Sequence, residues 1–203
     1  MARPSVEPIR RRDLMNAAIA AIHQRGSLDV TMSEIAGFAG VSPALAHHYF
    51  GGKDQLIVAS MRHLLSELRA AVIPALKAAQ TPRERISAVI NTSFAPEQFD
   101  EKTVAAWLTF YHYAQSSDDA ARLLTVYFAR LKSNLANALR QLAEPGDAIM
   151  IAGGAAALID GLYLRYGLKT GAPPRDHART LVERYIDDAL IAASAAASSN
   201  QPV

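Results

Sequence analysis

The feature that most constrains the fold is a pair of short, capped helices packed closely between residues 31 and 52. TMSE at 31–34 is a capping box, in which the threonine caps the helix start and the glutamate reaches back to it. This helix ends at Gly40, and Ser42-Pro43 starts the next one with a serine N-cap and a proline in the first turn. Gly51-Gly52 ends the second helix. Two helices joined by a short glycine turn form a helix-turn-helix.

The rest of the chain is also predicted to be helical. Apolar residues recur at a spacing of three to four over Arg10–His23, before the capped pair, and over Lys53 to about Leu76, where Pro74 should kink or end the helix. A second capping box stands at 81–84, and no long segment alternates with a period of two. Further helices are predicted over 82–94, 101–115, 118–143, 147–169 and 175–196.

These patterns predict an all-α protein of about nine helices in two domains. Residues 1–53 are predicted to form a three-helix DNA-binding domain with the helix-turn-helix, and residues 54–196 a helical bundle. Residues 197–203 are polar and of low complexity, so we expect a frayed tail.

Composition narrows the class of protein. Half of the 203 residues are hydrophobic, which is enough for a sizeable core, and there is no cysteine, which excludes disulfides and fits a reducing compartment. The N-terminus lacks the apolar region of a signal peptide. The most apolar run, 148–159, is shorter than the roughly 20 residues that span a bilayer. We therefore expect a cytoplasmic protein without membrane contact.

The net charge of +2 comes from residues 1–63, where the basic residues gather at Arg10-Arg11-Arg12. Taken alone, this cluster is equally consistent with a solvated helix start. Beside a helix-turn-helix, Arg10 to Arg12 can supply phosphate contacts, and Lys53 at the start of the following helix is a predicted phosphate clamp.

The second helix of the motif has two distinct faces. In a helix-turn-helix this helix lies in the major groove and uses its N-terminal residues on base edges. Leu45, Ala46 and Tyr49 share the side expected to face the core. Ala44, opposite them, is placed to contact a thymine methyl, and either histidine a base edge or a phosphate. The predicted outward residues are Pro43, Ala44, His47 and His48.

No pattern in the sequence indicates catalysis or metal binding. His47 and His48 are adjacent, whereas a helical zinc pair needs a spacing of four. Paired carboxylates and Ser/His/Asp sets are absent, so no catalytic residue, metal or cofactor is predicted. Because such sets can be assembled from distant residues, a helical enzyme or an interaction module is the remote alternative.

The segment DVTMSEIAGFAGVSPALAHHYFGGKDQLI resembles the TetR family of one-component transcriptional repressors. Further along, AAWLTFYHYAQ and AALIDGLYLRYGLKTG look like the ligand domain of its choline-responsive BetI type. The resemblance implies a homodimer that binds palindromic double-stranded operator DNA and is released by a small molecule. It places at the DNA Thr31, Ser42, Pro43, Ala44, His47, His48, Tyr49 and Lys53.

The aromatic residues suggest where an effector binds. Eleven of the fourteen lie beyond residue 63, and the simplest interpretation of any single one is core packing. As a set, they suit a cage around a quaternary ammonium, with about 2 kcal/mol for a desolvated cation–π contact. Asp160, inside an apolar helix, is predicted to bond a tyrosine or cap a neighbouring helix, or else to balance a cationic ligand. The predicted ligand-binding residues are Trp107, Phe110, Tyr111, Tyr127, Asp160, Tyr163 and Tyr166.

Small residues in the predicted helix 147–169 allow close helix packing, and no strand precedes its glycines, which excludes a phosphate loop. By resemblance the last two helices form the dimer interface, with Gly154, Ala157, Gly161 and Tyr185 as candidates.

The predicted function is a repressor of glycine-betaine synthesis genes that responds to choline or a related quaternary ammonium. The alternative is a repressor of efflux or catabolic genes with an aromatic or lipophilic effector.

Overall fold

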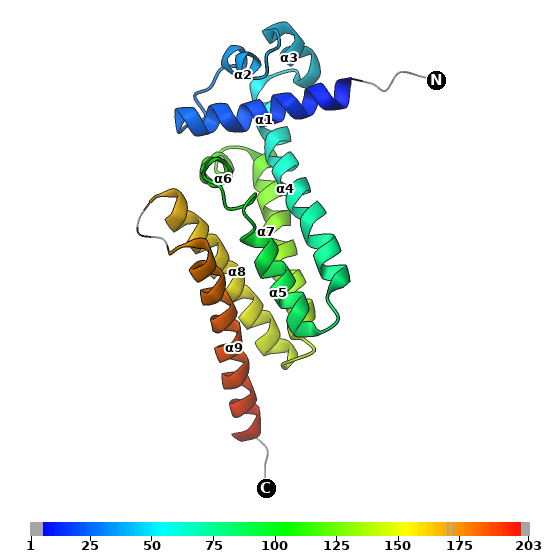
Figure 1. The fold of residues 1–203 in the computed structure, drawn as a ribbon, viewed down its shortest axis with the longest axis vertical. Helices are drawn as coiled ribbons and strands as arrows, with labels where there is room; N and C mark the ends of the chain where they lie inside the picture. The colour runs from blue at the N-terminus through cyan, green and yellow to red at the C-terminus, as the bar shows by residue number, and fades with distance from the viewer. Residues whose placement is uncertain (1–5, 170, 172, 200–203) are drawn as a thin grey trace, which may run out of the picture. The chain divides into compact units, whose positions relative to one another are not determined.

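The structure is a computed structural model that describes residues 6–169, 171 and 173–199. Over these ranges the chain forms nine α-helices and no strand, which confirms the predicted all-α class (Figure 1). The helices are α1 (Glu7–Arg25), α2 (Met32–Phe38), α3 (Pro43–Phe50), α4 (Lys53–Ala78), α5 (Pro82–Ser93), α6 (Glu101–Tyr113), α7 (Asp118–Leu139), α8 (Pro145–Gly167) and α9 (Arg175–Ser199).

Helix boundaries differ from the predicted ones at a few ends. α1 starts at Glu7, before the predicted start, because Pro8 is well tolerated in a first helical turn. α4 does not end at Pro74 but continues to Ala78. α9 extends to Ser199, into the predicted tail, whose last residues 200–203 lie outside the described residues.

Both predicted capping boxes are present. The Thr31 hydroxyl accepts a hydrogen bond from the Glu34 amide at 3.1 Å, and the Glu34 carboxylate accepts one from the Thr31 amide at 2.6 Å. The same reciprocal pair joins Thr81 and Glu84 at the start of α5. Each box satisfies amides that have no partner inside the helix, which fixes where α2 and α5 begin.

The helices form two compact units. Unit 1 contains the chain up to Glu67 together with Glu101–Leu124, and unit 2 contains Leu68–Asp100 and the chain from Thr125 onwards. α4 and α7 each contribute to both units. α6, which lies within the range predicted as the C-terminal bundle, packs in unit 1 with the helix-turn-helix.

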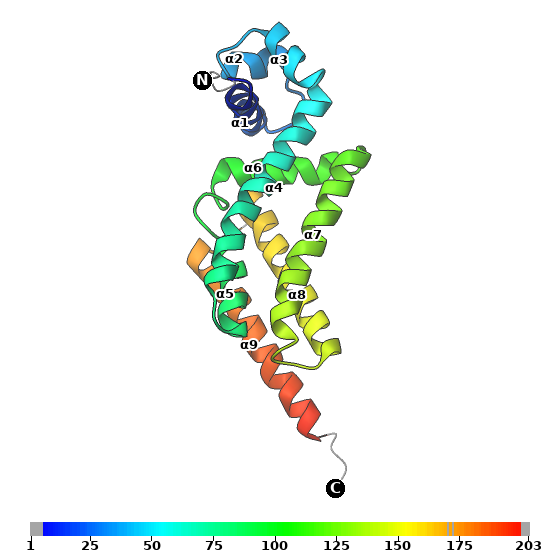
Figure 2. The same cartoon turned by 90° about the vertical axis from the view of Figure 1, so that its right-hand side faces the viewer.

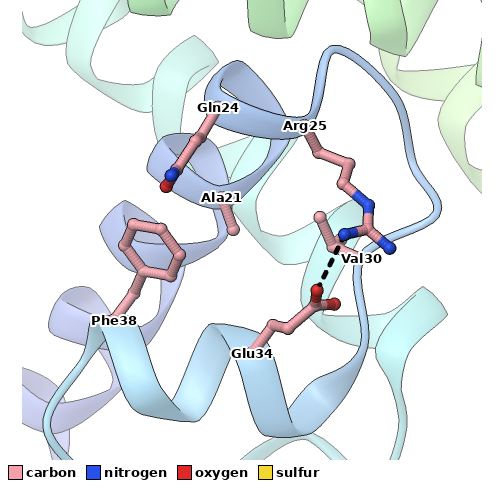
Figure 3. Close-up of a pocket in the computed structure, with 6 residues that line it drawn as sticks. All are labelled: Ala21, Gln24, Arg25, Val30, Glu34 and Phe38. Atoms are coloured by element: carbon pink, nitrogen blue, oxygen red, sulfur yellow. Dashed lines mark ion pairs between the residues drawn. The ribbon is translucent and has the colours of Figure 1, made fainter.

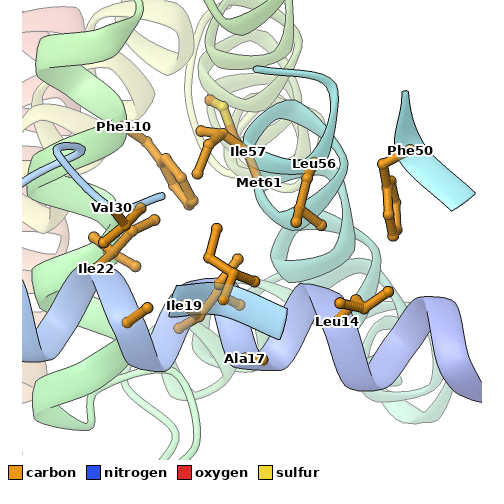
Figure 4. Close-up of a cluster of buried hydrophobic side chains, with 14 of the residues drawn as sticks. Leu14, Ala17, Ile19, Ile22, Val30, Phe50, Leu56, Ile57, Met61 and Phe110 are labelled. Atoms are coloured by element: carbon orange, nitrogen blue, oxygen red, sulfur yellow. The ribbon is translucent and has the colours of Figure 1, made fainter. Parts of the chain in front are cut away.

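Unit 1 is built around α1. α2 and α3 lie along one side of α1 and α6 along the other (Figures 1 and 2). Figure 4 shows the apolar core between them. A fully buried aliphatic or aromatic side chain contributes about 1.5–3 kcal/mol, so this core dominates the stability of the unit. Its most deeply buried members include Leu14, Ile22, Ile35, Leu56, Ile57, Met61 and Phe110.

Unit 2 contains an antiparallel pair formed by α8 and α9, and α9 also packs against α5 (Figure 2). Ile86 and Ile90 of α5 and Ile186 of α9 are fully buried. A polar contact joins the same two helices: the Arg83 guanidinium donates to both carboxylate oxygens of Asp187, at 3.0 and 3.1 Å, and also pairs with Glu183. The paired oxygens match the planar fork of an arginine, which sets the register of α9 on α5.

The apolar run at 148–159 lies inside α8, in agreement with the helix predicted over 147–169. α8 has 23 residues and is, by length and composition alone, apolar enough to cross a membrane. Asp160 lies inside this helix, as predicted, and α8 packs against α9 with several buried residues. Buried core helices pass the same test of length and composition, so this property is weak support for membrane insertion.

Candidate DNA-binding and effector sites

The second helix of the motif, α3, presents the two faces that the sequence predicts. Ala46 and Phe50 are buried and Tyr49 is half-buried against the core of unit 1. The opposite side is open to solvent at Pro43, Ala44, His47 and His48. The predicted division of the helix is confirmed, whereas contact with DNA at these residues stays a prediction.

The turn before α3 fixes where this exposed face begins. Gly40 has a φ of 64°, in the left-handed region that favours glycine. The amide of Val41 donates to the carbonyl of Ala36 at 3.0 Å, which folds the turn back onto α2. The Ser42 hydroxyl then accepts from the amide of Leu45 at 3.2 Å and caps α3. Pro43 and Ala44 therefore form a small, exposed tip.

The two histidines have different surroundings. Nδ1 of His47 lies 3.1 Å from the carbonyl oxygen of Gly51, one turn further on. A bond to that carbonyl needs a proton on Nδ1, which leaves Nε2 of a neutral His47 as an acceptor. The ring of His48 instead packs beside Tyr49, with ring centroids 5.5 Å apart. The structure describes no group of three or more His, Asp or Glu side chains around either one that would hold a metal ion.

The basic residues near α3 differ in burial: Lys53 and Arg11 are half-buried, whereas Arg10 and Arg12 are exposed. The ammonium of Lys53 donates to the carbonyl of Leu28 at 3.1 Å. An ammonium carries three donors, so a phosphate can still be bound. Arg11 differs from the predicted phosphate contact: its guanidinium is turned inward onto the end of α3.

A hollow of about 250 Å³ lies between α1 and α2 (Figure 3). Two of the residues that line it form an ion pair, in which Nη1 of Arg25 lies 3.1 Å from Oε1 of Glu34. The hydrogen bonds from the backbone and side chain of Thr31 hold the pKa of Glu34 below its ordinary value, and Arg25 adds to this effect. None of the residues predicted to bind an effector lines this hollow, which is lined by Ala21, Gln24, Arg25, Val30, Glu34 and Phe38.

Three of the predicted effector residues lie on α6 in unit 1. Trp107 and Phe110 are buried, and Tyr111 is half-buried. The ring of Trp107 lies edge-on to Phe110, with centroids 6.3 Å apart, and is tilted at 6.0 Å from Tyr111. All three pack in or against the apolar core that also holds α1 and the start of α4.

Tyr163 and Tyr166, on α8 in unit 2, belong to an aromatic cluster that the sequence reasoning missed. Tyr163 lies edge-on to Phe99 at 5.1 Å and is stacked on Phe94 at 6.2 Å, and Phe99 lies 4.5 Å from Tyr166. The hydroxyl of Tyr163 bonds the carbonyl oxygens of Ser93 and Gln98. Two phenylalanines five residues apart around a proline, in FAPEQF, were the available signal.

Tyr127 and Asp160 meet between α7 and α8 in unit 2. The tyrosine hydroxyl donates to the Asp160 carboxylate at 3.1 Å, and both residues are half-buried. The predicted tyrosine partner of Asp160 is therefore confirmed. The structure thus brings Tyr127 to Asp160, Tyr163 and Tyr166 to Phe99, and the three α6 residues together, as separate contacts within their own units.

The four candidates for a dimer interface lie on α8 and α9. Gly154 faces Tyr185 of the same chain so closely that a Cβ at 154 would overlap the phenol, with Cζ only 2.6 Å away. This pair holds α8 and α9 together within one chain. Ala157 is exposed and Gly161 is half-buried. Large apolar side chains that are exposed on the same two helices are Ile149, Met150, Leu164, Leu181 and Ile191.

A capped helix-turn-helix with an exposed small tip, flanked by basic residues on an all-helical chain, defines a DNA-binding regulator. Residues 14–60 match the model of the bacterial regulatory proteins of the tetR family, and residues 82–191 match that of the BetI-type transcriptional repressor C-terminal domain. The chain belongs to the BetI type of the TetR family of ligand-responsive transcriptional repressors.

Individual relatives agree with this assignment. The chain is 58% identical to the HTH-type transcriptional regulator BetI of Brucella canis over 92% of this chain and 94% of that protein. It is 52% identical to BetI of Rhizobium meliloti over 92% of each. Among solved structures, a putative regulator from Pseudomonas aeruginosa PAO1 has a TM-score of 0.79 at 27% identity, covering 91% of each chain.

A second solved structure resembles this chain in its fold, at a sequence identity that carries no argument beyond the fold. It is a putative transcriptional regulator from Saccharomonospora viridis in complex with choline, with a TM-score of 0.77 at 22% identity. The likeness covers 89% of this chain and 96% of that one.

Proposed function

We propose that this repressor binds a palindromic operator as a homodimer and is released by choline or a related quaternary ammonium. The observation that carries the proposal is the 58% identity to BetI of Brucella canis, which extends over both the helix-turn-helix and the effector region. By the same argument the protein is a cytoplasmic regulator without catalytic activity, and glycine-betaine synthesis genes are its proposed targets.

The proposed DNA surface uses the exposed tip of α3. Pro43 and Ala44 have small side chains, so the backbone can approach the base edges closely. Nε2 of His47 offers an acceptor further along the helix. Thr31, Ser42, His48, Tyr49 and Lys53 complete the proposed surface, and of these Lys53 supplies charge for a phosphate.

Dimerisation is proposed through α8 and α9. The exposed apolar residues of these helices, such as Met150 and Ile191, need a cover that the single chain does not supply. A second copy packed on the same helices by a two-fold axis would provide it, with Ala157 and Gly161 allowing close approach. Such a dimer presents two α3 helices to half-sites about 34–36 Å apart, one turn of DNA.

Asp160 and Tyr127 are the proposed centre of the effector site. A carboxylate that keeps a tyrosine beside it offers both a counter-charge and an aromatic face to a quaternary ammonium. The choline complex of the Saccharomonospora viridis regulator supports the proposal, since it shows that this fold can hold choline.

The aromatic residues of α6 offer a route from effector to DNA. Trp107 and Phe110 share one apolar core with α1 and the start of α4. An effector that favours another position of α6 would therefore disturb the packing that supports α3. The affinities for effector and operator are then coupled reciprocally, because each ligand favours a different conformation.

Operator binding with and without choline tests this function. Fluorescence anisotropy of a labelled duplex from the DNA upstream of the gene should show sequence-specific, salt-sensitive binding that millimolar choline weakens. If the protein shows no sequence-specific binding even without choline, the proposed role as a DNA-binding regulator is refuted. If specific binding is present but choline does not weaken it, only the proposed effector is refuted.

The alternative effector is an aromatic or lipophilic molecule for a repressor of efflux or catabolic genes. One observation favours it: Tyr163 packs with Phe94 and Phe99 and its hydroxyl bonds two backbone carbonyls, so this tyrosine serves the fold rather than a cage. Calorimetry with choline, betaine aldehyde and a panel of aromatic acids and amines separates the two candidates.

A further inference from the structure

We propose that Arg11 is a positioning residue for operator recognition, which fixes the C-terminal end of α3 on α1 without contacting DNA. The inference rests on the proposed function, because it concerns how the recognition helix is held. It separates Arg11 from Arg10 and Arg12, its neighbours in the sequence.

Two contacts carry this assignment. The Arg11 guanidinium carbon lies 4.4 Å from the centroid of the Phe50 ring, a cation–π contact. Nη1 of the same group donates a hydrogen bond to the backbone carbonyl of Tyr49. Phe50 is only 7% exposed, so the ring that the guanidinium covers is part of the core of unit 1.

The end of α3 needs such a partner. The last four carbonyls of an α-helix lack donors within the helix, and α3 has only eight residues. A helix of this length is not stable on its own in water, so its orientation depends on contacts from outside. A cation at the C-terminus also interacts favourably with the helix dipole. Arg11 supplies both the donor and the charge.

The other partners at this end are local. The amide of Gly51 donates to the carbonyl of His47 at 2.7 Å, and Nδ1 of His47 lies near the carbonyl of Gly51. These contacts close the last turn of α3 but do not join it to another helix. Among the hydrogen bonds described for this end, the one from Arg11 links α3 to α1.

The neighbouring arginines serve as internal controls. Arg10 and Arg12 are exposed. Nη1 of Arg10 lies 4.0 Å from Oδ2 of Asp13, on the same helix. A phosphate contact by either would be seen in the salt dependence of DNA binding, whereas a positioning residue would not change that dependence. The salt dependence of operator binding therefore distinguishes a phosphate contact from a positioning role among these three neighbouring arginines.

The test uses Arg11→Lys, Arg11→Gln and the control Arg12→Gln in the full-length protein. A lysine keeps the charge but lacks the planar fork that stacks on a ring while donating to a carbonyl. Operator affinity is measured by anisotropy at several salt concentrations, on the minimal duplex protected by the wild-type protein. Thermal unfolding and circular dichroism check that each variant is folded.

We expect both Arg11 variants to bind the operator about tenfold more weakly, with the slope of log K against log salt unchanged. Arg12→Gln, by contrast, should lower that slope by about one if Arg12 contacts a phosphate. A drop of about one in the slope for Arg11→Gln, or wild-type affinity for Arg11→Lys, would overturn the positioning role.

A second variant keeps the proposal testable if Arg11→Gln fails to fold. Phe50→Leu removes the ring but keeps an apolar side chain, so it should weaken operator binding in the same way. Arg11→Lys combined with Phe50→Leu should lose less than the sum of the two single losses, because both remove the same contact. Full additivity would overturn the proposal. If the wild-type protein itself binds no operator, the proposed function fails instead.

Discussion

The proposed DNA surface and the proposed effector site are built in opposite ways. The outward residues of α3, which are Pro43, Ala44, His47 and His48, are exposed and take no part in the core of unit 1. The effector candidates are embedded in packing, with Trp107 and Phe110 in the core of unit 1 and Tyr163 bonded to backbone carbonyls in unit 2. Substitutions of these outward residues should therefore change recognition alone, whereas substitutions of the embedded effector candidates also change stability.

Phe110→Ala should give the largest effect. The side chain is fully buried, and removing it leaves a cavity, which typically costs about 3–5 kcal/mol of unfolding free energy. His48→Ala, on the exposed face of α3, should change stability by less than about 0.5 kcal/mol. Urea denaturation of both variants measures the contrast. Similar losses for the two would break the distinction between the surfaces.

Asp160→Asn tests whether an embedded residue also binds the effector. The amide keeps the size of the side chain but removes the negative charge, so choline affinity should fall about tenfold. Asp188→Asn, on the exposed side of α9, is the control and should leave affinity unchanged. Isothermal titration calorimetry measures both. If Asp160→Asn binds choline as well as the wild type does, the carboxylate has only a structural role.

Gly154 and Gly153 give a matched pair on α8. Gly154→Ala should destabilise the protein by about 1–2 kcal/mol, because the new Cβ overlaps Tyr185 and forces that side chain to move. Gly153→Ala meets only the end of Lys132, at 3.9 Å, and should stabilise α8 by about 0.5–1 kcal/mol. Thermal unfolding at fixed protein concentration compares the two. Shifts of the same sign would contradict the close packing described for Gly154.

The pH dependence of the first capping box should be the smallest effect. The bonds from Thr31 lower the pKa of Glu34 below its ordinary 4.5, so the carboxylate stabilises the folded protein above that value. This contribution is lost as the pH falls from about 4.5 through the lowered pKa. Glu34→Gln lacks the titrating group, so its thermal midpoint should approach that of the wild type as the pH falls over this window. A gap between the two that stays constant would argue against the box as the cause.

The helix-turn-helix was predictable from sequence because its signals are local. Thr31, Ser42 and Gly40 each act on residues within one turn, and the periodicity of α3 alone separates Ala46 from His47. The effector region depends on contacts between distant segments. Phe94 and Phe99 meet Tyr163 across about seventy residues, and no periodic pattern encodes that pairing. The orientation of Arg11 was not predictable for the same reason, since only the tertiary structure shows which of the three arginines turns inward.

The small exposed tip at Pro43 and Ala44 has a consequence for how such a regulator diverges over time. Because these side chains carry little of the core packing, replacing them leaves the folded state nearly as stable as before. Mutations that alter operator preference can then accumulate without selection against misfolding. The cap at Ser42 holds α3 in place while its exposed residues change, so duplicated copies can acquire new target genes and retain the old effector.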